Sequence, residues 1–129
     1  MGYGREMKFI LDDSSDGLPI QHYAEGQVTI GQKIYRGSLI LMPDRVIPDW
    51  PPDSVEELQT EDLDLLADLA PEILILGTGR QQRFLHPSLL QPLMQAHIGF
   101  EAMATPAACR TYNILMSEGR RVAAALFMI

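Results

Sequence analysis

Hydrophobic residues in the first half of the chain form short runs separated by turn residues, a pattern typical of hairpin-connected strands. Val28–Ile30 and Lys33–Tyr35 flank Gly31-Gln32, and a glycine placed first in a two-residue connection favours a type II′ turn. Further strands are expected at Met7–Leu11, Ser38–Met42 and Val46–Trp50, with a polar turn at Asp12–Gly17. The first half is therefore predicted to be mainly β.

The second half alternates helical and strand patterns. Thr60 is expected to cap a helix that Pro71 ends, because leucines and alanines recur between them at helical spacing. Ile73–Leu76 is a continuous apolar run, which indicates a strand covered on both faces. The remaining expected elements are a helix from Pro87 to about His97, a strand Phe100–Ala104, a helix from Thr105-Pro106 to Gly119 and a strand Arg121–Phe127.

This order of elements predicts the fold class. Strand–helix–strand–helix–strand implies crossover connections and a mostly parallel core. We therefore expect a three-layer α/β fold, with a central mixed, mostly parallel sheet flanked by helices and an extra N-terminal β-hairpin layer. Residues 1–129 are expected to form a single domain, with residues 1–7 as a disordered N-terminal extension.

Composition narrows the protein class. The single cysteine excludes an internal disulfide, which suits a reducing compartment. The chain opens without a basic stretch followed by an apolar segment, and its longest apolar run, Val122–Ile129, is too short to span a bilayer. We therefore expect a cytoplasmic protein without stable membrane insertion.

Charge is distributed unevenly along the chain. Residues 1–72 hold 15 acidic and 5 basic side chains, whereas residues 73–129 hold 2 acidic side chains and 5 arginines. Between Arg45 and Arg80 there is no Lys, Arg or His. An acidic surface there would repel nucleic acid and attract a basic protein partner through Glu61, Asp62 and Asp64. The alternative is a solvated face that keeps the protein soluble.

The only tryptophan allows two interpretations. Trp50 stands between Asp49 and two prolines, where it would either anchor a partner or close the edge of the sheet as a core residue.

Candidate chemistry gathers where two predicted strands end. Ligands of open α/β sheets bind outside the carboxyl ends of the strands. Gly77, Thr78, Gly79, Arg80 and Arg83 follow the first of these strands, and Thr105 and Arg110 belong to the helix that follows the second. Loop amides, a helix N-terminus and arginines are the parts of an anion site. The alternative is a tight strand exit that uses glycines for their conformational freedom.

Other chemistry has weaker support. Cys109 lies near a helix start and next to Arg110, both of which lower the pKa of a thiol, so a reactive thiol competes with a small buried core residue. The three histidines lack the spacing of metal ligands. No metal and no cofactor are predicted, and no catalytic residue is assigned.

Three motifs carry a resemblance to a known family. They are Pro71–Gly79 (PEILILGTG), Thr105–Leu115 (TPAACRTYNIL) and Glu118–Leu126 (EGRRVAAAL). With Ser38–Trp50 they make the chain resemble, from about Lys8 to Leu126, a family of single-domain proteins of unknown function. Its eukaryotic relatives include the mitochondrial complex I assembly factor three and the adipogenesis-associated Mth938-domain protein.

The resemblance implies a three-layer α/β fold with a central mixed sheet, and an accessory role in building membrane-bound respiratory complexes. It carries over no catalytic residue. Our first hypothesis is accordingly a non-enzymatic assembly or interaction protein that binds a protein partner. The second is a small anionic-ligand-binding or enzymatic domain that uses the Gly77–Arg83 loop and the start of the helix at Thr105.

Overall fold

The computed structural model describes residues 17–129. The strands of this part are β1 (Ile20–Ala24), β2 (Gln27–Ile30), β3 (Lys33–Tyr35), β4 (Leu39–Met42), β5 (Arg45–Pro48), β6 (Ile73–Gly77), β7 (Gly99–Met103) and β8 (Val122–Leu126). The α-helices are α1 (Thr60–Asp68), α2 (Gln91–Gln95) and α3 (Thr105–Ser117), and the 3-10 helices are η1 (Val55–Glu57) and η2 (Pro87–Leu90).

Five strands form a central mixed sheet in the order β5-β4-β8-β6-β7. β6 pairs in parallel with both β7 and β8, whereas β4 pairs antiparallel with β8 and β5. Strands β1, β2 and β3 form a separate antiparallel sheet. The predicted α/β class, central mixed sheet and extra β layer are confirmed, although parallel and antiparallel pairings are equally numerous in the central sheet.

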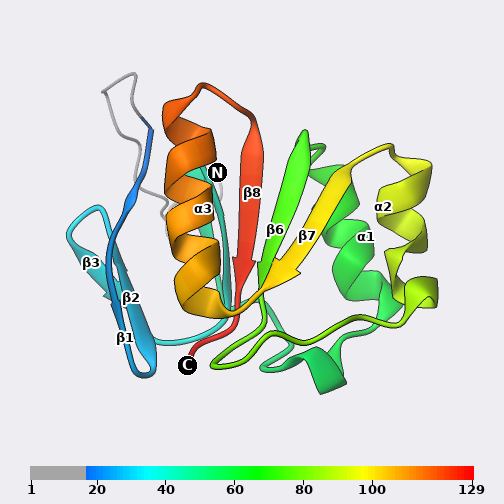
Figure 1. Cartoon of the computed structure of the whole chain (residues 1–129), viewed down its shortest axis with the longest axis horizontal. Coiled ribbons are helices and arrows are strands. Elements are labelled where there is room, and N and C mark those ends of the chain that lie inside the picture. The colour runs from blue at the N-terminus through cyan, green and yellow to red at the C-terminus, as the bar shows by residue number, and fades with distance from the viewer. Residues whose placement is uncertain (1–16) are drawn as a thin grey trace.

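The central sheet separates two hydrophobic cores. α3 and the three-stranded sheet cover one face, and α1 and α2 cover the other (Figure 1). Side chains alternate between these cores along β6, so that Ile75 faces α3 while Leu74 and Leu76 face α1 and α2. All three side chains are fully buried, which confirms the strand covered on both faces.

The extra β layer contains three strands, because β1 also pairs with β2, through the turn at Glu25-Gly26. β2 and β3 flank Gly31-Gln32 as predicted. The turn type was predicted wrongly: φ is 58° at Gly31 and 72° at Gln32. Positive φ at both central residues is the type I′ conformation, whose twist also suits a two-residue hairpin.

Two helices differ from their predicted bounds for local reasons. α1 is capped at Gln59, one residue earlier than expected, because the Asp62 carboxylate accepts a hydrogen bond from the Gln59 amide at 2.9 Å. The segment expected to be one helix from Pro87 is divided into η2 and α2. Pro92 explains the break, since its nitrogen carries no hydrogen and its ring disfavours an α-helical preceding turn.

The predicted strand Met7–Leu11, most of the turn Asp12–Gly17 and the extension 1–7 lie outside the described residues. Within residues 17–129, none of the helices combines the length and the apolar character needed to cross a membrane.

Candidate functional site

The exits of β6 and β7 meet at one edge of the central sheet, because the two strands are adjacent and parallel. After β6 the chain passes to η2 and α2, and after β7 it enters α3 on the opposite face. Such a divergence of consecutive connections is where open α/β sheets place ligands. We call residues 77–83 together with Thr105 the β6 exit.

Thr105 joins the two connections at the β6 exit. Its hydroxyl accepts a hydrogen bond from the Gly79 amide at 2.8 Å and donates one to the Phe127 carbonyl at 2.6 Å. Its own amide donates to the Gly79 carbonyl at 2.8 Å. Thr105 is fully buried. The amides of Gly79 and Thr105, which were expected to face an anion, therefore already have partners within the protein.

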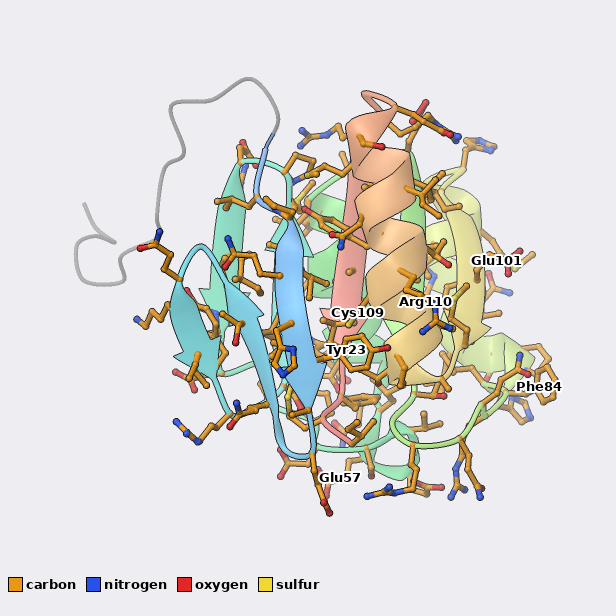
Figure 2. All side chains as sticks on the ribbon, turned by 60° about the vertical axis from the view of Figure 1, so that its left-hand side comes forward. Tyr23, Glu57, Phe84, Glu101, Cys109 and Arg110 are labelled. Carbon is orange, nitrogen blue, oxygen red and sulfur yellow. The ribbon has the colours of Figure 1, made fainter. Side chains whose placement is uncertain are left out.

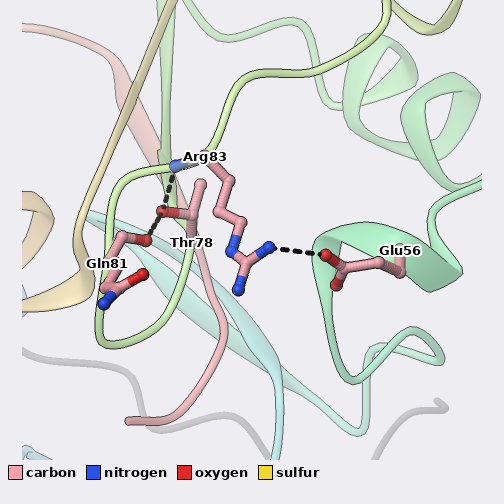
Figure 3. Close-up of polar contacts among 4 residues, drawn as sticks. All are labelled: Glu56, Thr78, Gln81 and Arg83. Carbon is pink, nitrogen blue, oxygen red and sulfur yellow. Dashed lines mark hydrogen bonds and ion pairs between the residues drawn. The ribbon is translucent and has the colours of Figure 1, made fainter.

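Thr78 organises the loop itself (Figure 3). Its hydroxyl donates to the Gln81 carbonyl at 2.6 Å and accepts from the Arg83 amide at 3.2 Å. Its amide donates to the carbonyl of Met103, the last residue of β7, at 2.8 Å, which extends the pairing with β7 one residue beyond the end of β6. The Thr78 side chain thus satisfies one amide and one carbonyl of the loop.

A side chain is disfavoured at both glycines of the β6 exit, for two different physical reasons. A Cβ at Gly77 would lie 2.9 Å from Leu126 Cδ2 and 2.9 Å from Thr105 Oγ1, so there is no space for a side chain. Gly79 has a φ of 102°, a conformation that L-residues with a side chain rarely adopt. Both observations agree with the alternative of a tight strand exit.

The predicted arginines divide between two places. Arg80 pairs with Glu25 at 3.2 Å and Arg83 pairs with Glu56 at 2.9 Å, and all four side chains are more than half exposed. Arg110 instead donates from Nη1 to the Tyr23 hydroxyl at 3.0 Å, on β1 (Figure 2). An anion site at the β6 exit stays a prediction, and Arg110 contacts a different element.

Cys109 is a buried residue of the core beside the three-stranded sheet, with 1% of its surface exposed. Burial raises the pKa of its thiol to about 12, and the Arg110 charge lowers it only in part. Burial of the thiol favours the alternative of a small core residue, because desolvation opposes the effects of the helix start and the adjacent arginine, and a reactive thiol stays a prediction.

Trp50 also lies in the core, which supports the second of its two interpretations. It is 3% exposed, and its ring stacks on Phe127 with 5.3 Å between centroids. The indole N–H has no hydrogen-bond partner in the described part of the molecule. The other interpretation, a partner anchor, would need a ring at the surface, and the Trp50 ring does not lie there.

The three predicted partner-binding acids lie together on α1. Glu61 and Asp64 are exposed, whereas Asp62 is partly buried and caps the helix. A groove of about 460 Å³ runs beside them, lined by Pro51, Pro52, Glu56, Glu57, Leu58, Gln59 and Asp62. Among residues 17–129 no three His, Cys, Asp or Glu side chains gather as a metal site.

One further group of polar residues was missed. His22 and Tyr23 on β1 line a groove together with Cys109, Arg110 and Asn113 on α3. The sequence carried one usable signal, Glu25-Gly26, which stands between two strand-like runs and predicts the β1–β2 hairpin. The contact between β1 and α3 had no such local signal, since it joins residues about ninety positions apart.

Comparison with known proteins identifies the family. The mouse protein named NADH dehydrogenase (ubiquinone) 1 alpha subcomplex assembly factor 3 is 37% identical over 110 residues, which are 83% of this chain and 58% of the mouse protein. This chain therefore spans less than two thirds of that relative.

Solved structures agree. A Bordetella parapertussis crystal structure has a TM-score of 0.82 at 38% identity and covers 88% of this chain and 97% of its own. A Bordetella pertussis structure described as a Mth938-like domain has a TM-score of 0.79 at 32% identity and covers 95% and 92%. Residues 20–127 match the family described as protein of unknown function (DUF498/DUF598), and the chain therefore belongs to that family.

Proposed function

We propose that this protein is a non-enzymatic accessory factor in the assembly of a multisubunit protein complex. The observation that carries the proposal is the similarity to relatives named as complex I assembly factors, at 37% identity to the mouse protein and 34% to the zebrafish protein. The similarity covers 83% and 88% of this chain. The NADH dehydrogenase in the names of those relatives is the first complex to test.

An acidic face formed by η1 and α1 is the proposed docking surface. Its exposed members are Asp53, Glu56, Glu57, Glu61, Asp64 and Asp68. Arg83 pairs with Glu56 at one end, but residues 46–79 contain no basic side chain of their own. Such a face attracts a partner with a basic surface and speeds their encounter at low salt.

The groove of about 460 Å³ gives this face a shape that fits a basic side chain. Glu57 accepts from the Asp53 amide and Asp62 accepts from the Gln59 amide, both at 2.9 Å. Each carboxylate keeps unused lone pairs, because two oxygens can accept about four hydrogen bonds. A lysine or arginine of a partner would therefore find oriented acceptors.

The experiment is deletion of the gene in its own host, followed by native gel electrophoresis of NADH dehydrogenase. We expect less assembled enzyme and more of its subcomplexes, with recovery when the wild-type gene is returned. Normal assembly in the deletion strain would contradict the proposal for this complex.

A charge-reversal pair tests the acidic face. We expect Glu61→Lys with Asp64→Lys to fail in restoring assembly, because both side chains are exposed and neither has a hydrogen-bonding role within residues 17–129. The matched control is Glu101→Lys with Glu118→Lys, which makes the same change in net charge elsewhere. Asp62 is left unchanged because its reversal would also remove the cap of α1. Equal recovery by both variants would exclude the acidic face while leaving the assembly role intact.

A cytoplasmic location also stays a prediction, and fractionation of cells that express the tagged full chain tests it.

A further inference from the structure

A groove between β1 and α3 has the features of a small-ligand site. Its volume is about 510 Å³, within the range of roughly 300–1,000 Å³ usual for such sites. The described residues that line it are Ile20, Gln21, His22, Tyr23, Cys109, Arg110 and Asn113. Figure 2 shows Tyr23, Cys109 and Arg110 close together where β1 passes α3. We call this the β1–α3 groove.

Hydrogen bonds at both ends hold the groove open and fixed. At one end the Asn113 side chain accepts from the Ile20 amide at 2.8 Å and donates to the Ile20 carbonyl at 2.9 Å. At the other end Arg110 donates to the Tyr23 hydroxyl at 3.0 Å. Between them the register of β1 shifts at Gln21, and such bulges redirect side chains near binding sites. The two walls are therefore preorganised before any ligand arrives.

The charge of the groove contrasts with that of the chain. The protein has a net charge of −7, but none of the described lining residues is acidic. In residues 17–129 a carboxylate lies within 4.0 Å of Arg45, Arg80, Arg83 and Arg120, whereas none lies that close to Arg36, Arg110 or Arg121. Within the same residues Arg110 is the arginine that lines the groove, and it donates to a neutral phenol. A guanidinium presents five N–H donors, so most of those of Arg110 are available.

We propose that the β1–α3 groove binds the oxyanion of a small organic acid, a carboxylate or a phosphate monoester. Arg110 faces the anionic oxygens, because its planar fork matches both groups. Ile20, the Tyr23 ring and the buried Cys109 side chain form the apolar part of the lining, which suits a short organic body.

Nuclear magnetic resonance titration of the full chain tests the site. Acetate, benzoate and inorganic phosphate are added separately at constant ionic strength, with chloride as the reference salt. We expect saturable shifts of the amides of residues 20–23 and 109–113 with an oxyanion but not with chloride. Stronger binding of benzoate assigns the site to carboxylates, and stronger binding of phosphate assigns it to phosphate esters.

Substitutions separate recognition from general charge. Arg110→Gln is expected to weaken binding by about tenfold or more, since it removes the guanidinium but keeps a polar side chain. Tyr23→Phe is expected to weaken it by a few fold, because Arg110 loses the hydroxyl that orients it. The control Arg120→Gln removes an arginine paired with Glu72 and should leave the affinity unchanged.

Two results would overturn the proposal. One is the absence of saturable shifts at these amides with all three oxyanions in the folded wild-type chain. The other is equal affinity in wild type and Arg110→Gln, with circular dichroism showing both folded. Neither result bears on assembly of NADH dehydrogenase in the deletion strain, so the two proposals stand or fall separately.

Discussion

Arginines and small polar side chains gather at two places in this molecule, the β6 exit and the β1–α3 groove, and the two places differ in what those groups already bind. At the β6 exit the Gly79 and Thr105 amides and both threonine hydroxyls bond to the protein itself. In the β1–α3 groove the Arg110 guanidinium donates, within residues 17–129, a hydrogen bond to the Tyr23 phenol and to no other group. The bonding partners of polar residues, and not their position after a strand alone, therefore indicate which groups are free to bind a ligand.

Burial explains this difference. Gly79 and Thr105 are buried, and a buried polar group without a partner loses its bonds to water and gains nothing. The chain therefore satisfies these groups internally, and the same bonds hold two connections together. Arg110 is exposed, so water can satisfy its donors until a ligand replaces it.

The largest effect is expected at Thr105. Thr105→Val keeps the shape of the side chain but leaves the Gly79 N–H and the Phe127 carbonyl without their bond to the hydroxyl. We expect the free energy of unfolding to fall by about 2–4 kcal/mol, measured by urea denaturation. The control Thr111→Val removes only a contact to the Met103 sulfur at 3.3 Å and should lose much less. Equal losses in the two variants would show that the β6 exit is not held by Thr105.

A smaller loss is expected at Gly77. In Gly77→Ala the new methyl group would meet Leu126 and Thr105 at 2.9 Å and Ala108 at 3.2 Å. Overpacking of this kind costs about 1–3 kcal/mol, which urea denaturation measures. Gly37→Ala is the control, because nothing lies within 4 Å of a Cβ at Gly37. A Gly77→Ala variant as stable as wild type would mean that Leu126, Thr105 and Ala108 move aside without cost, and that Gly77 is not required for close packing.

The free energy of unfolding is expected to depend on pH through Cys109, which lines the β1–α3 groove. Burial raises the pKa of Cys109 from 9.0 to about 12, so the unfolded chain loses this proton at lower pH than the folded protein does. The contribution of the Cys109 thiol to the free energy of unfolding is therefore intact below pH 9.0 and declines as the pH rises towards about 12. We expect the free energy of unfolding to fall by about 1 kcal/mol at pH 10, an effect absent in Cys109→Ala. Tyr112, whose pKa burial also raises, is common to both proteins and cancels in the comparison.

A labelling experiment checks the same residue. Iodoacetamide should modify native Cys109 more slowly than free cysteine, because the thiol is 1% exposed and its pKa is raised. A rate equal to or faster than that of free cysteine would mean that the groove opens to expose Cys109.

The fold was predictable from the sequence where local patterns determine it. The apolar run Ile73–Leu76, the proline after Thr105 and the pair Gly31-Gln32 each indicated an element that the structure contains. The junction of the β6 and β7 exits was also predictable, since adjacent parallel strands end at one edge. Periodicity is a short-range signal, so it predicts helices, strands and their order but not contacts between residues far apart in the sequence.

The partners of the polar side chains were not predictable in this way. Arg110 and Tyr23 are 87 positions apart, and nothing near Arg110 in the sequence distinguishes it from Arg80 or Arg83. The burial of Trp50 depends on Phe127 at the other end of the chain. Cys109 shows the same limit, because its neighbours suggest a low thiol pKa whereas the tertiary core raises it.

The smallest effect is expected at the two exposed ion pairs of the β6 exit. Arg80→Ala with Arg83→Ala should lower the free energy of unfolding by less than about 1 kcal/mol, because exposed pairs gain little and are screened by salt. The difference from wild type, measured by urea denaturation, should shrink further at high salt.

The same variant tests the predicted anion site in a thermal-shift assay with phosphate. If phosphate raises the melting temperature of wild type and of this variant equally, and Arg110→Gln removes the effect, the β1–α3 groove is the site. If the double variant removes it and Arg110→Gln does not, the β6 exit binds the anion in spite of its internal bonds, and the contrast between the two places fails.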